Sequence, residues 1–330
     1  MKISIKNLEE LILKSLKLKY SIEDAKNICD VILFGELSEK TTHGIVRLLI
    51  GNASVLAQNP KGKPIAKKIT SVSTLIDGNG NPGMLVGPLA MNEAMQLAKT
   101  HGIGIVGTNK SFSSSGCLSY YAEIIAQNNL IGIIMAHSPP STAPHGGIEP
   151  LFGTNPIGFG IPARPRPLIF DMATSAISFG AILKAATLGH ELSENCAIDS
   201  AGNSTTDPKK AMEGATLPFD SSYKGAGLAM MVEILAGAMP GADFVGQNPE
   251  AGWGNLFIVF SPTLFGNLEQ FKQNVYTLVQ RVRNSKTKDG HKIRIVGENT
   301  IAKRNINLEK GEIDIEDKLY QELKQSAKIN

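Results

Sequence analysis

The stretch GGIEPLFGTNPIGFGIP at residues 146–162, followed closely by FDMATS at residues 170–175, is the most informative part of this 330-residue chain. Repeated glycine and proline interleaved with small polar residues make a poor hydrophobic core but a good wall for a ligand. Glycine allows backbone N–H groups to approach a bound molecule closely, and proline fixes the loop conformation beforehand. The same composition also fits tight turns that join short strands, so composition alone leaves both interpretations open.

Upstream of this stretch, the first sixty residues have the periodicity of helices. Asn7 and Ser21 are placed to cap two amphipathic helices, and a third helix is predicted from His43 through Leu56. The breaker-rich segment NPKGKP at residues 59–64 ends this helical part and is predicted to be a linker.

After residue 64 the apolar residues alternate between strand-like and helix-like patterns, which favours an α+β fold. The segments that look like strands are residues 69–76, 103–106, 130–136 and 293–296. The segments that look like helices are residues 88–99, opened by Pro88, residues 224–239, expected to be buried, and residues 316–327.

Bulk composition argues against several classes of protein. The formal net charge is +3 without a long basic run, so nothing favours nucleic-acid binding. No apolar run has the length of a membrane span or the position of a signal peptide. The three cysteines are scattered and without CxxC spacing, which argues against disulfides and a zinc site and fits a reducing compartment. We therefore expect a cytoplasmic globular protein without a metal site.

Two matches to the dinucleotide-binding pattern GxGxxG occur, and neither has the context of a Rossmann unit. Residues 102–107 follow a predicted helix and enter a strand, which reverses the required order. Residues 78–83 lie between a strand and a helix, but Pro82 removes an amide from the phosphate site. No acidic residue near residues 99–103 could bind a ribose. We therefore expect a fold other than Rossmann.

His43 and Arg47, in the segment THGIVRL at residues 42–48, form the sharpest local pair of reactive side chains. If the segment from Gly44 is helical, the two lie four residues apart on one face. A histidine such as His43 can donate a proton near neutral pH, and an arginine such as Arg47 can bind a carboxylate in a bidentate fork. Spacing alone also fits an exposed pair at a helix start. His137 is expected to be an ordinary surface or packing residue.

These segments together resemble the type-2 malate/L-lactate dehydrogenase family, whose members reduce 2-oxo acids or related imines with NAD(P)H. The resemblance extends in the family's order from His43 to about Leu319 and includes Lys224-Gly225 and the turn at residues 296–299. It implies a homodimer with a helical domain, residues 1–64 completed by about 300–330. It also implies a mixed-sheet domain for cofactor binding and dimerisation, residues 65–299.

The resemblance also implies roles for single residues. His43 would exchange a proton with the substrate oxygen, and Arg47 would hold the carboxylate of a small 2-oxo or 2-hydroxy acid. The cofactor would be NAD or NADP, and the sequence does not distinguish them. The residues implied to contact the cofactor are Ser138, Asp171, Met172, Ala173, Ser175, Lys224, Gly225, Gly297, Glu298 and Asn299.

The chain departs from the family's pattern near the reacting groups. Ser114 stands where the family commonly has a histidine that is catalytic in some members, and serine donates a hydrogen bond but is no acid at neutral pH. Ala181 replaces a lysine, and Thr41-Thr42 replaces the usual Asp-Ser. Two hypotheses follow. The first, which we favour, is an active dehydrogenase that relies on His43 with Ser114 as a hydrogen-bond donor. The second is a diverged nucleotide- or metabolite-binding relative with weak or no catalysis.

Overall fold

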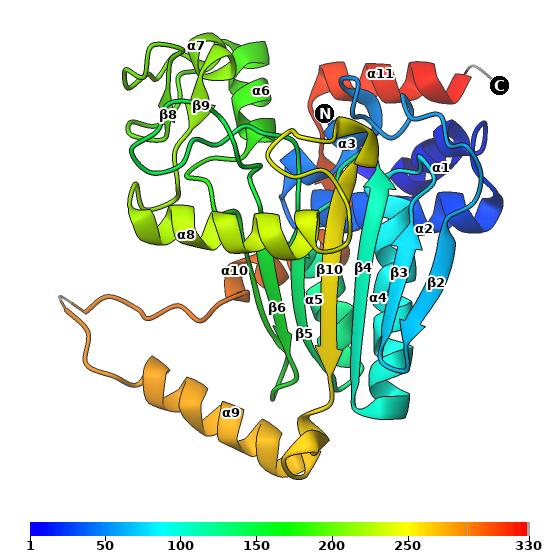
Figure 1. Cartoon of the computed structure of the whole chain (residues 1–330), viewed down its shortest axis with the longest axis vertical. Helices are drawn as coiled ribbons and strands as arrows, with labels where there is room; N and C mark the ends of the chain where they lie inside the picture. Colours follow the sequence, from blue (N-terminus) through cyan, green and yellow to red (C-terminus); the bar gives the residue numbers. More distant parts are fainter. Residues whose placement is uncertain (289, 329–330) are drawn as a thin grey trace.

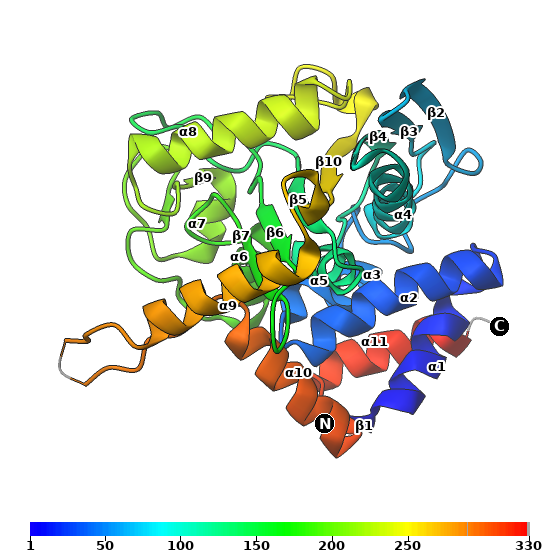
Figure 2. The same ribbon diagram turned by 90° about the horizontal axis from the view of Figure 1, so that it is seen from below.

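The computed structural model describes residues 1–288 and 290–328. A seven-stranded sheet carries helices on both faces, and a layer of helices that contains both chain ends packs beside it (Figures 1 and 2). The strands are β1 Lys2–Ser4, β2 Ile65–Thr70, β3 Ser73–Asp77, β4 Ile103–Ser111, β5 Ile131–Ala136, β6 Ile157–Ile161, β7 Leu168–Met172, β8 Ala197–Ile198, β9 Ala215–Thr216, β10 Trp253–Phe260 and β11 Glu312–Asp314. The helices are α1 Ile5–Leu16, α2 Ile22–Leu37, α3 Ile45–Leu49, α4 Gly83–His101, α5 Leu118–Gln127, α6 Phe179–Leu188, α7 Pro208–Glu213, α8 Tyr223–Val232, α9 Leu268–Arg283, α10 Glu298–Lys310 and α11 Asp317–Lys328.

The large sheet has the strand order β2-β3-β4-β10-β5-β6-β7. Only β3 and β4 run parallel, and every other neighbouring pair is antiparallel. Gly102 ends α4 in the left-handed conformation, with φ 83°, before β4 begins, so the first GxGxxG match does run from helix to strand. The expected α+β class and the absence of a Rossmann topology are both confirmed.

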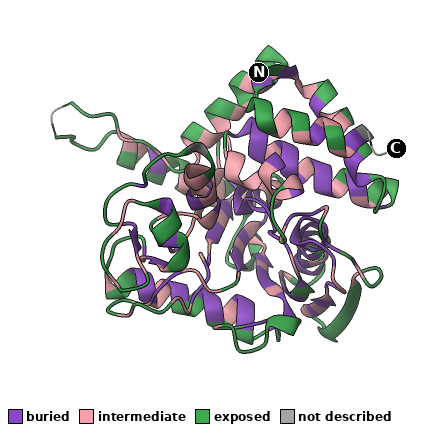
Figure 3. Ribbon diagram, turned by 90° about the horizontal axis from the view of Figure 1, so that it is seen from above, coloured by how far each residue is buried: buried purple, intermediate pink, exposed green. Residues whose placement is uncertain are grey.

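The central strand β10 shows why both faces of the sheet are covered. Side chains alternate along a strand, and on β10 Phe257 and Val259 join the core formed with α4 and α5. Leu256 and Ile258 face the other way and pack with Val232 of α8 and the helical turn that follows it. Figure 3 shows the resulting pattern, with buried residues inside and exposed residues on the outward helix faces.

The helical layer is closed by the two ends of the chain. Leu8 and Leu16 of α1 share one buried core with residues of α2, α3 and Leu323 of α11. β1 pairs with β11 through the register Ile3↔Ile313. Ser21 caps α2 as predicted, but the cap of α1 is Ser4, whose hydroxyl accepts from the N–H of Asn7 at 3.2 Å.

Several predicted element bounds are wrong. Residues 43–56 do not form one helix, because a 3₁₀ turn at Thr41–His43 leads into the short α3, and Gly51 then turns the chain with φ 82°. Pro88 lies inside α4 instead of opening it. Residues 293–296 contain no strand.

The segment at residues 224–239 is helical, but only one of its faces is buried. α8 continues as a π-helix at Glu233–Ala238. Met230, Met231, Ile234 and Met239 remain about half exposed, because this helix lies on the outer side of the sheet and nothing in the described chain packs on its outward face. No helix among the described residues combines the length and apolar character needed to cross a bilayer.

Candidate active site

A cavity of about 420 Å³ lies where the helical layer meets the sheet and α6. His43, Arg47, Ser114 and Ser138, which come from three separate segments, all line it. No aspartate or glutamate is among the described residues that line this cavity. A cavity that contains a guanidinium and an imidazole but no lining carboxylate suits an anionic ligand.

Thr42 connects the two reactive side chains. Gly44 interrupts the helix with φ −101° and ψ −131°, so His43 ends the 3₁₀ turn while Arg47 lies within α3. Arg47 Nε donates to the Thr42 carbonyl at 2.9 Å, and the Thr42 hydroxyl lies 3.0 Å from His43 Nδ1. The hydroxyl therefore orients the imidazole in place of the carboxylate that the sequence lacks, which leaves His43 Nε2 for a ligand.

The surroundings of His43 favour its neutral form. Burial and the charge of Arg47, with a further contribution from Lys40, lower the pKa of His43 to about 4, and the nearby Asp171 carboxylate opposes this shift. At neutral pH the imidazole is therefore uncharged and able to accept a proton. Burial also lowers the pKa of Arg47, but a guanidinium keeps its charge in proteins.

Gly180 allows Arg47 to occupy its position. A Cβ on Gly180, in the first turn of α6, would lie 3.0 Å from Arg47 Nη2 and 3.1 Å from Thr42 Cβ. A side chain at this glycine, which precedes Ala181 in the sequence, would therefore push the guanidinium and Thr42 away by a few tenths of an ångström.

Gly180→Ala is therefore expected to displace the guanidinium and raise KM for the acid substrate by about fivefold to thirtyfold, since weakened hydrogen bonds to a charged group cost about 1–2 kcal/mol. The nucleotide KM is expected to stay unchanged. Gly266→Ala adds the same methyl group where nothing lies within 4 Å and serves as the control. Equal acid KM values for both variants would contradict this role of Gly180.

Glu36 of α2 holds the first turn of α3, two residues after His43. Its buried carboxylate accepts from the N–H of Ile45 at 2.6 Å, and a Cβ on Gly44 would overlap its side chain. Burial raises the pKa of Glu36 to about 7, against the opposing effects of the Ile45 hydrogen bond and the Lys184 charge.

Glu36 makes the stability of the fold depend on pH. Because its pKa is higher in the folded chain than in the unfolded chain, ionisation disfavours folding, and stability falls between about pH 4.5 and pH 7. Glu36→Gln keeps an acceptor for Ile45 and removes this loss, which is at most about 3 kcal/mol. Urea titrations measure the unfolding free energy of both proteins at pH 5 and at pH 8. We expect the difference, variant minus wild type, to be larger at pH 8 than at pH 5. A constant difference between the two proteins at both pH values would refute this assignment.

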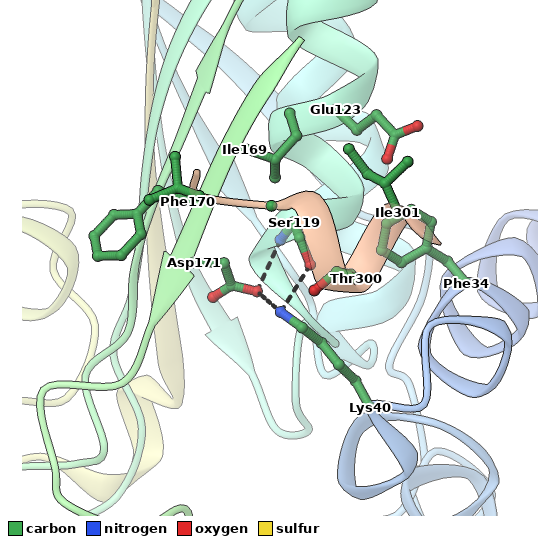
Figure 4. A pocket seen from close by; sticks show the side chains of 11 residues that line it. Phe34, Lys40, Ser119, Glu123, Ile169, Phe170, Asp171, Thr300 and Ile301 are labelled. Carbon is green, nitrogen blue, oxygen red and sulfur yellow. Dashed lines mark hydrogen bonds and ion pairs between the residues drawn. The ribbon is translucent and has the colours of Figure 1, made fainter. Parts of the chain in front are cut away.

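A second cavity, of about 230 Å³, is shown in Figure 4, and its wall includes Lys40, which lies three residues before His43 in the chain. Asp171, at the end of β7, and Gly297, directly before α10, both line it, although they come from separate cofactor motifs. Lys40 Nζ lies 2.6 Å from Asp171 Oδ2 and 3.0 Å from the Ser119 hydroxyl. Phe34, Ile169 and Ile301 supply apolar walls around this polar group.

The second cavity fits part of a nicotinamide dinucleotide. Among the described residues, no hydrogen bond is made to Asp171 Oδ1, so this oxygen can accept from a ligand. A Cβ on Gly297, which has φ 81°, would lie 2.7 Å from the Ile169 carbonyl, so only glycine allows this close approach. Apolar walls beside a donor and an acceptor match the flat ring and polar edges of a nucleotide.

The other predicted cofactor residues line neither cavity. Ser175 is buried, and its hydroxyl donates to the Ile177 carbonyl at 2.8 Å. Glu298 forms ion pairs with Arg166 and Arg283. The rest lie at the end of β7 or just after it, in the first turn of α8 and in the first turn of α10: Met172, Ala173, Lys224, Gly225 and Asn299.

His137, expected to be an ordinary surface or packing residue, is buried and lies in the cavity wall, a position that the sequence did not indicate. It lines the first cavity, its side chain is fully buried, and its Nε2 lies 3.4 Å from Glu233 Oε1. Glu233 also accepts from Asn155 Nδ2 at 2.6 Å. No local sequence signal could have indicated this cluster, because its members are far apart in the chain.

The glycine-rich stretch forms part of a cavity wall and also a strand. Thr154 and Pro156 line the first cavity, and β6 begins at Ile157. A Cβ on Gly153 would lie 2.3 Å from the Ser138 carbonyl, so glycine is needed for the two loops to meet there. Composition left two interpretations open, a wall of a binding cavity and turns joining short strands, and each describes part of the stretch.

Comparisons with known proteins agree with this geometry. The model of the malate/L-lactate dehydrogenase family matches residues 3–324. The chain is similar to the L-sulfolactate dehydrogenase of Methanocaldococcus jannaschii, with 37% identity over 97% of this chain and 94% of the relative. It is also similar to Delta(1)-pyrroline-2-carboxylate reductase 1 of Burkholderia ambifaria, with 37% identity over 74% of this chain and 75% of the relative. The crystal structure of malate dehydrogenase from Entamoeba histolytica matches with a TM-score of 0.92 at 28% identity and covers 100% of this chain and 98% of that chain.

The comparisons thus assign this mixed-sheet fold, with its arginine-containing cavity, to a class of dehydrogenases of non-Rossmann type. The chain belongs to the malate/L-lactate dehydrogenase family, which confirms the resemblance of its motifs. It is an NAD(P)-dependent oxidoreductase that transfers a hydride between the cofactor and C2 of a small 2-hydroxy or 2-oxo acid.

Proposed function

We propose that the first cavity binds the acid substrate and that His43, Arg47 and Ser114 carry out the proton transfer and substrate binding. The observation that carries this proposal is the convergence of these three side chains on one cavity that no described carboxylate lines. Arg47, held by the Thr42 carbonyl, binds the substrate carboxylate in a bidentate fashion.

His43 exchanges the proton. In the oxidation direction the neutral imidazole accepts the proton of the C2 hydroxyl, and an oxidised nicotinamide, when bound, would take the hydride from C2. In the reduction direction His43 must be charged. A substrate carboxylate on Arg47 offsets the guanidinium charge that lowers the pKa of His43, so substrate binding favours the protonated imidazole. The Ser114 hydroxyl accepts from the N–H of Gly116 at 3.1 Å and can donate its own proton to the substrate oxygen.

We also propose that the cofactor lies along the second cavity and contacts Asp171 and Gly297 directly. Met172, Ala173 and Ser175 continue the segment after Asp171, and Glu298 and Asn299 continue the turn after Gly297. Ser138, Lys224 and Gly225 complete the proposed set of contacts. Ser138 is supported by its place in the wall of the first cavity.

The boundaries of the domains and the assembly are further parts of this proposal. Residues 1–64 with about 300–330 form the helical domain, which the shared core of α1, α2 and α11 supports, and residues 65–299 form the cofactor domain. The half-exposed methionines of α8 and the π-helix support a homodimer formed on this face. Three buried free cysteines support a reducing, cytoplasmic location. Light scattering tests the dimer, which should have twice the chain mass of 35.2 kDa.

A substrate screen tests the activity. Purified protein is mixed with NADH or NADPH and with oxaloacetate, pyruvate, sulfopyruvate or a cyclic 2-imino acid, and the loss of reduced-nicotinamide absorbance is followed. We expect turnover of at least one of these substrates. Thermal stabilisation by a nucleotide without turnover of any acid would support the diverged binding protein instead.

A further inference from the structure

Lys40 connects the helical layer to the sheet beside the proposed reacting groups. It precedes the 3₁₀ turn that contains His43, and its ammonium lies 2.6 Å from Asp171 Oδ2 on β7 and 3.0 Å from the Ser119 hydroxyl on α5. The two charged side chains are 26% and 10% exposed, so water screens this ion pair only weakly (Figure 4). No motif in the sequence indicated a role for Lys40.

Asp171 is held as a fixed negative charge. The N–H of Ser119, in the first turn of α5, donates to Asp171 Oδ2 at 3.0 Å. Burial alone would favour the neutral acid, but the charge and hydrogen bond of Lys40 and the hydrogen bond from the Ser119 N–H hold the pKa of Asp171 below its ordinary value. The carboxylate therefore remains ionised and in one place at neutral pH.

We propose that Lys40, three residues before His43, is a positioning residue for the reaction: it holds the Asp171 carboxylate at the boundary between the helical layer and the sheet. This inference rests on the proposed role of His43. Lys40 and Asp171 act on the imidazole with opposite signs, because Asp171 raises the pKa of His43 and Lys40 lowers it. The pair thereby adjusts how readily His43 takes up and releases its proton.

The other charged or titratable groups near His43 are not substituted in the test, so they are the same in the wild type and in every Lys40 variant. Glu36 of α2 is bonded to Ile45, and Lys184 of α6 pairs with Glu316 at 2.8 Å. The remaining groups are Arg47 on α3, Cys117 before α5 and His137 in the same cavity wall.

The test titrates His43 by NMR in the full-length protein without substrate. His43→Gln identifies its signal among the six histidines. Lys40→Met is expected to raise the titration midpoint by about one pH unit, the size expected for removing one charge several ångströms away in a protein interior. Asp171→Asn is expected to move it the opposite way, and Lys40→Arg to keep it near the wild-type value.

Equal midpoints in the wild type and Lys40→Met would overturn the proposal, even if the variant were less thermostable, because a purely structural role changes stability without moving the midpoint. If Lys40→Met does not fold, Lys40→Gln is titrated instead and the same outcomes apply. The NMR midpoint does not depend on turnover. A wild-type protein that reduces no acid would therefore count against the proposed function, whereas an unmoved midpoint counts against Lys40 alone.

Discussion

His43→Gln is expected to lower kcat/KM by about a hundredfold or more in both directions, because glutamine can occupy the site next to Thr42 but cannot exchange a proton. The nucleotide should bind as before, since His43 lines the first cavity, the proposed substrate site, and not the second. Steady-state kinetics and nucleotide titration measure the two effects separately. His101→Gln, on the exposed end of α4, is the matched control and should behave as the wild type.

The pH dependence of kcat/KM gives a second test of the role of His43. For oxidation of the hydroxy acid His43 must be neutral, so kcat/KM should be maintained as the pH falls and be lost only near the lowered pKa of about 4. An unperturbed histidine would lose activity near pH 6.5. A His43→Gln enzyme within threefold of the wild type would remove His43 from the proton-transfer role.

Arg47→Met is expected to lower kcat/KM for the acid by about a hundredfold, because a bidentate, charge-assisted contact of about 2–3 kcal/mol is lost. Most of this effect should be in KM. Arg47→Lys keeps the charge but not the planar fork, so we expect KM to rise about tenfold. Arg164→Met removes an arginine from the exposed surface and should leave both constants unchanged.

The two Arg47 variants also differ in their effect on His43. Arg47 lowers the pKa of His43, so Arg47→Met should move the acid limb of the profile to higher pH, whereas Arg47→Lys should leave it near the wild-type position. An acid KM that stays the same in Arg47→Met would show that the substrate carboxylate binds elsewhere.

The amino-acid sequence by itself determined the class of the fold and the chemical character of the site. Some features depend only on residues that are close in the chain, so they can be predicted from the sequence. These are the amphipathic pattern of α1 and α2, the Ser21 cap and the reversed glycine motif at residues 102–107. The same holds for His43 and Arg47, which are close in the chain. The relative orientation of the two side chains was not predicted, because Gly44 breaks the expected helix between them.

The tertiary structure alone decided which distant groups surround this pair. Lys40 meets Asp171, Gly180 makes room for Arg47, and His137 pairs with Glu233 only because separate elements pack together. Such contacts involve residues far apart in the chain, and no periodicity or spacing encodes them. The protonation of His43 depends on these contacts and on burial, so the chemistry of a residue visible in the sequence is set by neighbours that only the folded chain supplies.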